Sequence, residues 1–144
     1  MSRLIRRFQA ADRQAVIDLW RVCGLTRPWN DPAKDIDFCL SSQEATLLVG
    51  EAGGAIAATV MVGHDGHRGW LYYLAVDPQR QKNGFGRAMV AAAEDWLKSR
   101  RVPKVMLMVR PDNEQVRSFY ANIGYGEEPR IIFTKWLEDR PAAP

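Results

Sequence analysis

Three β-rich runs joined by short glycine turns place the strongest constraint on the fold of this chain. The runs cover residues 45–52 (ATLLVGEA), 55–63 (AIAATVMVG) and 70–76 (WLYYLAV). Gly53-Gly54 and Asp65-Gly66 stand between them, and glycine supplies the positive φ angles of a two-residue hairpin turn. The pattern predicts an antiparallel meander. Its third run is apolar at nearly every position, as in a central strand covered on both faces.

A helix and another apolar run follow the meander. The helix is indicated by an apolar stripe at helical spacing, made of Phe85, Met89, Ala92, Ala93 and Trp96. The run KVMLMV at 104–109 comes next. A strand, a helix and a strand in this order form a βαβ unit with parallel strands. We therefore expect an α+β fold, with a mixed, mostly antiparallel central sheet, one parallel βαβ crossover and helices on both faces.

Shorter signals of the same kind lie on either side. Residues 3–9 and 130–136 are strand candidates. Asp12 stands where the N-cap of a helix should be, and Asp112 with Gln115 suits the start of another. The inward positions expected in the three remaining helices are Val16, Leu19, Trp20 and Cys23; Ile36, Cys39 and Leu40; and Val116, Phe119, Tyr120 and Ile123.

The length and composition suit one domain, residues 1–138. The chain has 144 residues, 47% of them hydrophobic, and residues 139–144 are expected to form a flexible tail. A formal charge of +3 gives no reason to expect nucleic acid as a partner. Because no apolar run nears the length of a membrane span and the N-terminus lacks the apolar region of a signal peptide, we expect a cytoplasmic protein without a membrane partner.

The cysteines and histidines give no metal signal. Cys23 and Cys39 are the only cysteines, and without a secretory signal we expect two reduced, packed thiols. His64 and His67 flank the Asp65-Gly66 turn, but two histidines are too few ligands for a metal, and the turn alone explains the residues between them. No metal is expected.

The stretch QRQKNGFGRA at 79–88 leads into the long helix. A helix that opens at Gly84 has N–H groups without intrahelical partners and the positive end of its dipole at that place, and a phosphate satisfies both. Lys82 and Arg87 add positive charge, and a side chain at Gly84 or Gly86 would hold the phosphate away. The glycines also suit a tight strand-to-helix turn with no ligand.

Two common nucleotide sites are excluded by the residues that follow these glycines. A Walker loop needs Gly-Lys-Ser/Thr, whereas Gly86 is followed by Arg87 and Ala88. A dinucleotide fingerprint needs a third glycine where Met89 stands. Any phosphate site here therefore belongs to another family.

Two motifs resemble the GNAT superfamily of acyl-CoA-dependent N-acetyltransferases. Residues 81–86 (QKNGFG) fit its Gln/Arg-x-x-Gly-x-Gly/Ala signature and follow LAVDP at 74–78, while Asn113 with 119–125 (FYANIGY) resembles its downstream element. The order of elements is also similar over nearly the whole chain. RPWNDP and GHDGHRG further resemble a small bacterial subfamily typified by YpeA.

The resemblance implies where acetyl-CoA, the acyl donor, would bind. The backbone of residues 74–76 would pair with the pantetheine arm as an added strand, and the N–H groups of residues 82–87 would hold the pyrophosphate. Asn113 would hydrogen-bond near the pantetheine. The expected cofactor-binding residues are Leu74, Ala75, Val76, Gln81, Lys82, Asn83, Gly84, Phe85, Gly86, Arg87 and Asn113.

Tyr120 is the expected catalytic residue. The resemblance implies that it faces the acetyl sulfur, and a phenol with a pKa of about 10 donates to a departing thiolate while staying protonated at neutral pH. Without the resemblance, its place on the inward stripe with Val116 and Phe119 also suits plain packing.

The general base and the acceptor site are less defined. Trp70 and Met108 occupy the two places where family members carry a glutamate base, so a water relay, desolvation, Tyr73, His64 or His67 would have to assist. The candidate acceptor residues are Trp29, Asp31, Asp65 and Tyr73, with Asp35 as a further carboxylate that could attract a cation. Surface carboxylates are also often merely solvated, and Trp29 suits packing equally well.

Three functions follow from these patterns. The first is an N-acetyltransferase that moves an acetyl group to a primary amine of a small molecule or protein by direct attack, without an acyl-enzyme; we expect a monomer or homodimer. The second is a non-catalytic acyl-CoA-binding regulatory module, which the missing carboxylate base favours. The third, binding of nucleic acid through Arg80, Lys82, Arg100 and Arg101, is the least supported.

Overall fold

The chain folds into two compact units. The computed structural model describes residues 3–139. The first unit is Met1–Leu107 and the second is Met108–Pro144. The single domain expected for residues 1–138 stays a prediction. The expected tail, apart from Asp139, lies outside the described residues.

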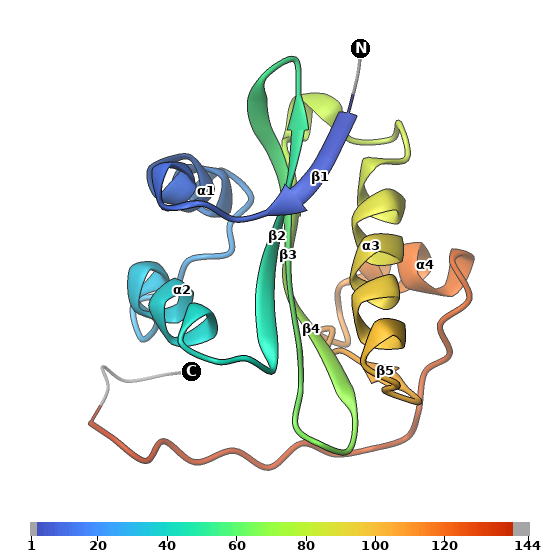
Figure 1. Ribbon diagram of the computed structural model, residues 1–144. Coiled ribbons are helices and arrows are strands. Elements are labelled where there is room, and N and C mark those ends of the chain that lie inside the picture. The colour runs from blue at the N-terminus through green and yellow to red at the C-terminus, as the bar shows by residue number, and fades with distance from the viewer. Residues whose placement is uncertain (1–2, 140–144) are drawn as a thin grey trace. The chain divides into compact units, whose positions relative to one another are not determined.

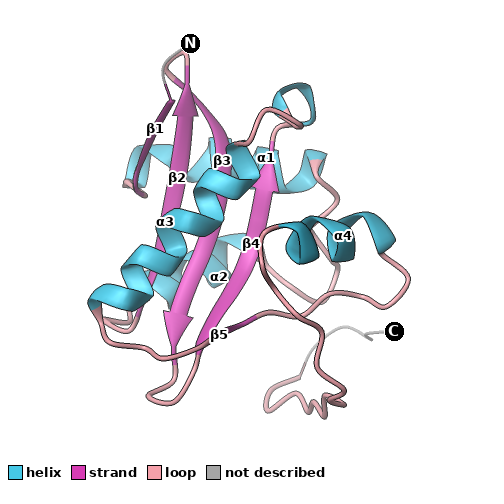
Figure 2. Ribbon diagram, turned by 90° about the vertical axis from the view of Figure 1, so that its right-hand side faces the viewer, coloured by secondary structure: helices cyan, strands magenta, loops and turns pink. Residues whose placement is uncertain are grey.

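The first unit is built on a mixed sheet. Its strands are β1 (Arg3–Arg7), β2 (Ala45–Ala52), β3 (Ala55–His64), β4 (Gly69–Val76) and β5 (Val105–Met106), and they lie in this order (Figure 2). Neighbouring strands are antiparallel except β4 and β5, which are parallel. The expected meander, its two turns and the parallel crossover are therefore confirmed.

Helices cover both faces of this sheet, as expected. Figure 1 shows α1 (Arg13–Val22) and α2 (Pro32–Leu40) on one face and α3 (Phe85–Ser99) on the other. Short 3-10 turns precede α1 (Ala10–Asp12) and α3 (Pro78–Arg80). The second unit holds α4 (Glu114–Asn122).

The face under α1 and α2 carries one large cluster of the apolar core. Trp20 and Ile36 are completely buried there, next to Leu47 and Val49 of β2. The helical stripes predicted these contacts, with one exception. Leu40 is 44% exposed, because α2 ends at this residue and only Ile36 and Cys39 are buried along it.

On the opposite face, α3 makes a close contact with the sheet at its first residue. Phe85, the first residue of α3, is buried against β2 at Gly50. A Cβ atom at Gly50 would lie 2.5 Å from Phe85 Cε1, so only glycine leaves room for this ring. The amino end of α3 is thereby fixed against the sheet.

The two predicted caps have different outcomes. Asp12 is the N-cap residue of α1, as predicted, but its carboxylate makes no side-chain cap there and instead accepts hydrogen bonds from the Gln9 N–H (2.8 Å) and from Arg6 (2.8 Å). The Arg6 guanidinium holds the pKa of Asp12 below its usual range. The cap of α4 is Asn113, which accepts from the Val116 N–H (3.2 Å), rather than Asp112 with Gln115.

Three predicted strand features also differ. The run 104–109 contributes only Val105–Met106, and Tyr72 in β4 is 45% exposed rather than covered on both faces. Residues 130–136 form no strand, and Ile131 and Phe133 are 86% and 93% exposed. A strand needs a partner for its N–H and C=O groups, and the described part of the second unit contains none.

Candidate active site

Strand β4 changes character along its length. Residues 69–72, here called the regular half, follow an unbroken register with β3, and Gly69 and Trp70 also pair with β5. Residues 73–76, here called the open half, have no strand partner on the β5 side in the part of the chain that the structure describes. Their outward N–H and C=O groups can therefore pair with an added, strand-like ligand.

A β-bulge separates the two halves. The register with β3 shifts between Thr59 and Met61, where the partner on β4 jumps from Ala75 to Tyr72. Tyr73 takes a positive φ of 53°, which is rare for a residue other than glycine and costs about 1–3 kcal/mol. Such strain persists only where the surroundings hold it, and bulges often occur beside active sites.

Buried side chains hold this bulge. Trp20 Nε1–H donates to Thr59 Oγ1 (2.9 Å), and the Thr59 hydroxyl donates to the Tyr73 carbonyl (2.8 Å). The Trp20 and Tyr73 rings also stack, with centroids 3.7 Å apart and planes 10° from parallel. Because Trp20 and Thr59 are completely buried, this chain of contacts fixes the main chain at Tyr73.

The Tyr73 side chain ends at a carboxylate. Its hydroxyl donates to Asp35 Oδ2 of α2 at 2.6 Å. Burial first, and then the bond to Asp35, raise the pKa of Tyr73 well above its usual range. Tyr73 is therefore a protonated donor at neutral pH. This contact brings together two of the residues that the sequence offered as acceptor candidates.

The backbone of Val76 faces the open side of β4. Residue pairs in an antiparallel ladder alternate between hydrogen-bonded and non-hydrogen-bonded. Asp77 donates its N–H to the Ala57 carbonyl (2.8 Å), so the neighbouring pair of Val76 and Ala58 is not bonded. The Val76 carbonyl accepts instead from Gln81 Nε2 (3.0 Å) and, more weakly, from Cys23 Sγ (3.4 Å).

The contact from Gln81 explains one signature position. Gln81 ties the start of the glycine loop to the end of β4, because its amide reaches back to Val76. Gln81 therefore positions this loop relative to β4, and its side-chain amide is already used in the bond to Val76. The sequence placed Gln81 among the cofactor-binding residues, and that direct role stays a prediction.

The amino end of α3 opens at Gly84 without a side-chain cap. Gly84 has a φ of 83°, and its carbonyl accepts a hydrogen bond from the Ala88 N–H (3.0 Å) in the first turn. Lys82 is also left-handed, with a φ of 68°. Nothing lies within 4 Å of the place where a Cβ would stand at Gly84. The N–H groups here are therefore accessible to an anion.

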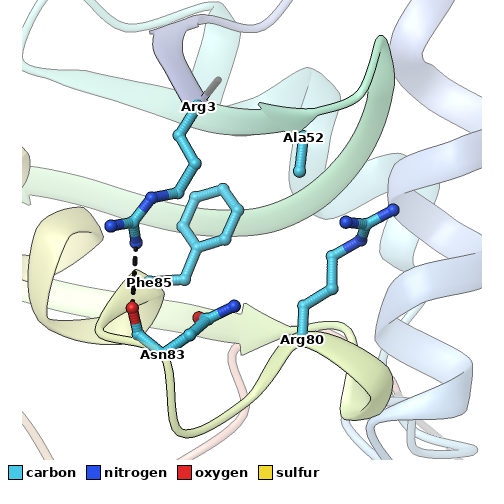
Figure 3. Close-up of a pocket in the computed structure, with 5 residues that line it drawn as sticks. All are labelled: Arg3, Ala52, Arg80, Asn83 and Phe85. Atoms are coloured by element: carbon cyan, nitrogen blue, oxygen red, sulfur yellow. Dashed lines mark hydrogen bonds between the residues drawn. The ribbon is translucent and has the colours of Figure 1, made fainter. Parts of the chain in front are cut away.

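A pocket of about 230 Å³ lies beside this loop and brings in two arginines (Figure 3). Arg3 of β1 donates to the Asn83 carbonyl (3.4 Å), and its guanidinium stands 5.2 Å from the centre of the Phe85 ring. Arg80 and Ala52 complete the lining. The sequence pattern did not link Arg3 to the loop, because the two are some 80 positions apart in the chain.

The remaining acceptor candidates have local structural roles. Asp31 caps α2 by accepting from the Ala33 N–H (3.0 Å), and Trp29 is half-buried in the loop before it. Asp65 accepts from the N–H groups of His67 (2.9 Å) and Arg68 (2.8 Å), so it closes its own hairpin turn. That bonding lowers the pKa of Asp65 to about 2. Their acceptor roles stay predictions.

The histidines lie at the other end of β4 from the open half. His64 pairs with Gly69 and contacts Glu44 Oε2 at 2.6 Å. Four positions separate Gly69 from Tyr73, the first residue of the open half, which is roughly 13 Å at the usual rise of a strand. The roles of His64 and His67 in assisting the amine stay predictions.

Asn113 and Tyr120 belong to the second unit. The Asn113 side chain is used as the cap of α4. The Tyr120 ring packs edge-on against Phe119 and Tyr125, with centroids 5.0 and 5.3 Å away, and burial raises its pKa to about 12. Tyr120 is therefore a protonated phenol at neutral pH, as the proposed acid requires. The roles of both residues toward the donor stay predictions.

A sequence model of the acetyltransferase (GNAT) family matches residues 13–125. The chain belongs to this family. An acetyltransferase of Yersinia enterocolitica is 44% identical to this acetyltransferase over 133 residues, which are 92% of this chain and 94% of the relative. The match spans both compact units.

Solved structures show the same fold. AAC(6′)-Iy, solved with a CoA-containing bisubstrate analogue, has a TM-score of 0.83 at 15% identity and covers 94% of this acetyltransferase and 99% of itself. An acetyltransferase of Clostridium acetobutylicum, solved with acetyl-CoA, has a TM-score of 0.78 at 15% identity, with 96% and 99% covered. At 15% identity, this similarity supports the fold alone.

Neither a membrane span nor a metal centre stands out in residues 3–139. No helix in that range is both long and apolar enough to cross a bilayer. The same range contains no group of three or more histidine, cysteine, aspartate or glutamate side chains placed to hold a metal ion.

Proposed function

We propose that this acetyltransferase moves the acetyl group of acetyl-CoA to a primary amine by direct attack of the amine on the thioester. One observation carries the proposal: the open half of β4 leads, through the glycine loop that Gln81 ties to Val76, to the uncapped amino end of α3. A donor with an amide-containing arm and a diphosphate would find strand-like partners and anion-binding N–H groups in succession.

The donor site follows from these two features. The main chain of residues 74–76 pairs with the pantetheine arm, and Val76 offers its N–H on that side. The diphosphate lies against the N–H groups of the loop from Lys82 to Arg87, where the helix dipole adds roughly half a positive charge. Lys82 and Arg87 are exposed cations next to these groups, and they strengthen the site.

The chemistry is acyl transfer to nitrogen. The lone pair of the neutral amine attacks the thioester carbonyl, and the carbon–sulfur bond then breaks. The attacking nitrogen releases one proton to solvent, and the departing thiolate takes up one proton. We assign that last proton to Tyr120. With a pKa of about 12, its phenol is protonated at neutral pH, so it can donate to the sulfur as negative charge develops there, and solvent then restores its proton.

The two cysteines support direct attack. Burial raises the pKa of Cys39 to about 11, and burial also raises the pKa of Cys23, whose thiol points at the Val76 carbonyl. A thiol is a nucleophile only as its thiolate. At neutral pH neither residue offers enough thiolate to form an acyl-enzyme.

The test combines donor binding and turnover. Isothermal titration with acetyl-CoA measures binding, and release of free thiol with a panel of primary amines measures transfer. Gly86→Glu is expected to weaken binding by about a hundredfold or more, because it puts a carboxylate where the diphosphate binds. Gly126→Glu is the matched control, since Gly126 is an exposed glycine with open space around it. Equal affinity in both variants would refute the donor site.

A non-catalytic acyl-CoA-binding module is the second candidate. It is favoured by Trp70 and Met108, which stand where a carboxylate base was expected. If acetyl-CoA binds but no amine in the panel releases its thiol, this second function replaces the first.

A further inference from the structure

We propose that Asp35 selects the acceptor by binding a second cationic group on it, so that the acceptors of this acetyltransferase are diamines and larger polyamines. The proposal rests on the proposed function, because it concerns the acceptor of that reaction. Its basis is the contact between Asp35 and Tyr73, which links α2 to the bulge at the start of the open half of β4.

Asp35 has one carboxylate oxygen in use and one available. Oδ2 accepts the Tyr73 hydroxyl, whereas Oδ1 has no hydrogen-bond donor among residues 3–139. No buried side-chain oxygen or nitrogen in that range lacks a partner, so Oδ1 reaches solvent. A half-buried carboxylate with one free oxygen can bind a ligand cation.

The nearest cations do not neutralise this carboxylate. Arg13 of α1 approaches α2, but it bonds to Asp37 Oδ1 (2.5 Å) and to the Ala33 carbonyl (3.3 Å). Lys34 is exposed, and no contact joins it to Asp35. Asp31 stands one helical turn before Asp35 and adds a second negative charge on the same side of α2.

The position of Asp35 relative to β4 is fixed from both sides. Ile36 and Cys39 are buried against β2, so α2 cannot turn freely. The Tyr73 ring is stacked on Trp20, and its main chain is held by the Thr59 hydroxyl. The carboxylate therefore stands one tyrosine side chain away from the main chain of the bulge.

This placement suits a spectator cation better than the reacting amine. A carboxylate next to an ammonium group stabilises the charged form and raises the pKa of that amine. The attacking nitrogen must lose its proton, so a strong contact with Asp35 would hold it in the unreactive state. A second ammonium has no such conflict, and the length of Tyr73 separates it from the reaction at the β4 main chain.

The test compares butylamine with 1,4-diaminobutane as acceptors in steady-state kinetics. We expect wild-type enzyme to prefer the diamine by about tenfold to a hundredfold in kcat/KM, mostly through KM, because one charge-assisted contact is added. Asp35→Asn should reduce this preference to about threefold or less. Asp37→Asn, on the same helix and paired to Arg13, is the matched control and should keep the wild-type preference.

Tyr73→Phe gives an independent variant. It keeps the ring stacked on Trp20 and removes the donor to Asp35, which leaves the carboxylate charged with both oxygens available, so the preference for the diamine should be kept or should rise. If Asp35→Asn does not fold, as judged by circular dichroism, loss of the diamine preference in Tyr73→Phe overturns the proposal.

Two further results have different meanings. If wild type uses both amines equally well, or if Asp35→Asn lowers both kcat/KM values in the same proportion, Asp35 is only a structural link and the inference is wrong, while the proposed function stands. If wild type binds acetyl-CoA but acetylates no amine at all, the proposed function fails and this inference with it.

Discussion

The two halves of β4 are built from the same kind of apolar residue and are held in place in different ways. The regular half, residues 69–72, is fixed by main-chain hydrogen bonds to β3 and, at its start, to β5. The open half, residues 73–76, begins at a strained residue and loses its neighbour on one side. There, side chains of α1, α2 and β3 contact Tyr73 and hold it in place.

This difference shows how the sheet makes room for a substrate. A fully paired strand has no N–H or C=O group left for a ligand. The open half keeps such groups, and the cost is offset by buried contacts of Trp20 and Thr59 with Tyr73. Substitutions that disturb the open half should therefore lower both stability and turnover, whereas substitutions in the regular half should lower stability alone.

The largest expected effect is at Trp20. Trp20→Ala removes a completely buried ring and the stack on Tyr73, and it should lower the free energy of unfolding by about 3–5 kcal/mol. Urea denaturation followed by fluorescence measures this. Trp96→Ala, which removes a half-buried ring on α3, is the control and should cost less. Equal losses would mean that the open half has no special support from α1.

Thr59→Val tests the bulge with a smaller change. The valine keeps the shape but leaves Trp20 Nε1–H and the Tyr73 carbonyl without their partner, which should cost about 1–3 kcal/mol and lower kcat. Thr46→Val is the matched control, because Thr46 is also buried (3% exposed) and no side-chain hydrogen bond is found for it among residues 3–139. If both variants keep wild-type kcat, the bulge does not depend on this hydroxyl.

Gly69→Ala probes the regular half. The added Cβ would lie 2.6 Å from Leu97 Cδ1 on α3, and the end of that leucine side chain can move aside. We expect a loss of stability of about 1 kcal/mol with kcat unchanged in the folded protein. Calorimetric melting and thiol release measure the two quantities. A large drop in kcat would show that the two halves are coupled.

The smallest effect is expected at Asp65, in the hairpin turn. Its pKa is about 2 in the folded chain, lowered first by the Arg68 N–H and then by the His67 N–H. A lowered pKa stabilises the folded state above the unfolded value of about 4, and this contribution is lost as the pH falls from about 4 to about 2. The melting temperature of Asp65→Asn should therefore be slightly below that of wild type at pH 7 and should meet it near pH 2. Turnover at pH 7 should not change, and a loss of turnover would place Asp65 in the acceptor site after all.

Local patterns predicted the elements well, and they predicted long-range contacts poorly. The turns at Gly53-Gly54 and Asp65-Gly66 and the start of α3 at Gly84 depend on backbone angles that glycine allows, so they are visible in a few residues. The apolar stripe of α3 likewise predicted which face it buries. Residues 130–136 show the limit, because β propensity alone cannot supply a partner strand.

For the same reason, only part of the candidate site could be predicted from the sequence. The glycine loop and residues 74–76 are contiguous motifs, whereas the bulge depends on how β3 and β4 match in length. Asp35 and Tyr73 are 38 positions apart, and nothing in either local pattern indicates that they meet. Thr59 gave the one usable signal, as a polar residue inside the apolar run 55–63.

The sequence by itself determined the meander, the crossover helix and the loop with uncapped N–H groups, because each follows from spacing and backbone freedom within a short window. Only the tertiary structure decided that the pairing of β4 with β5 ends after Trp70, that Tyr73 is strained, and that α2 brings a carboxylate to its hydroxyl. These features arise when elements distant in the chain pack together, and packing depends on the shape of all partners at once.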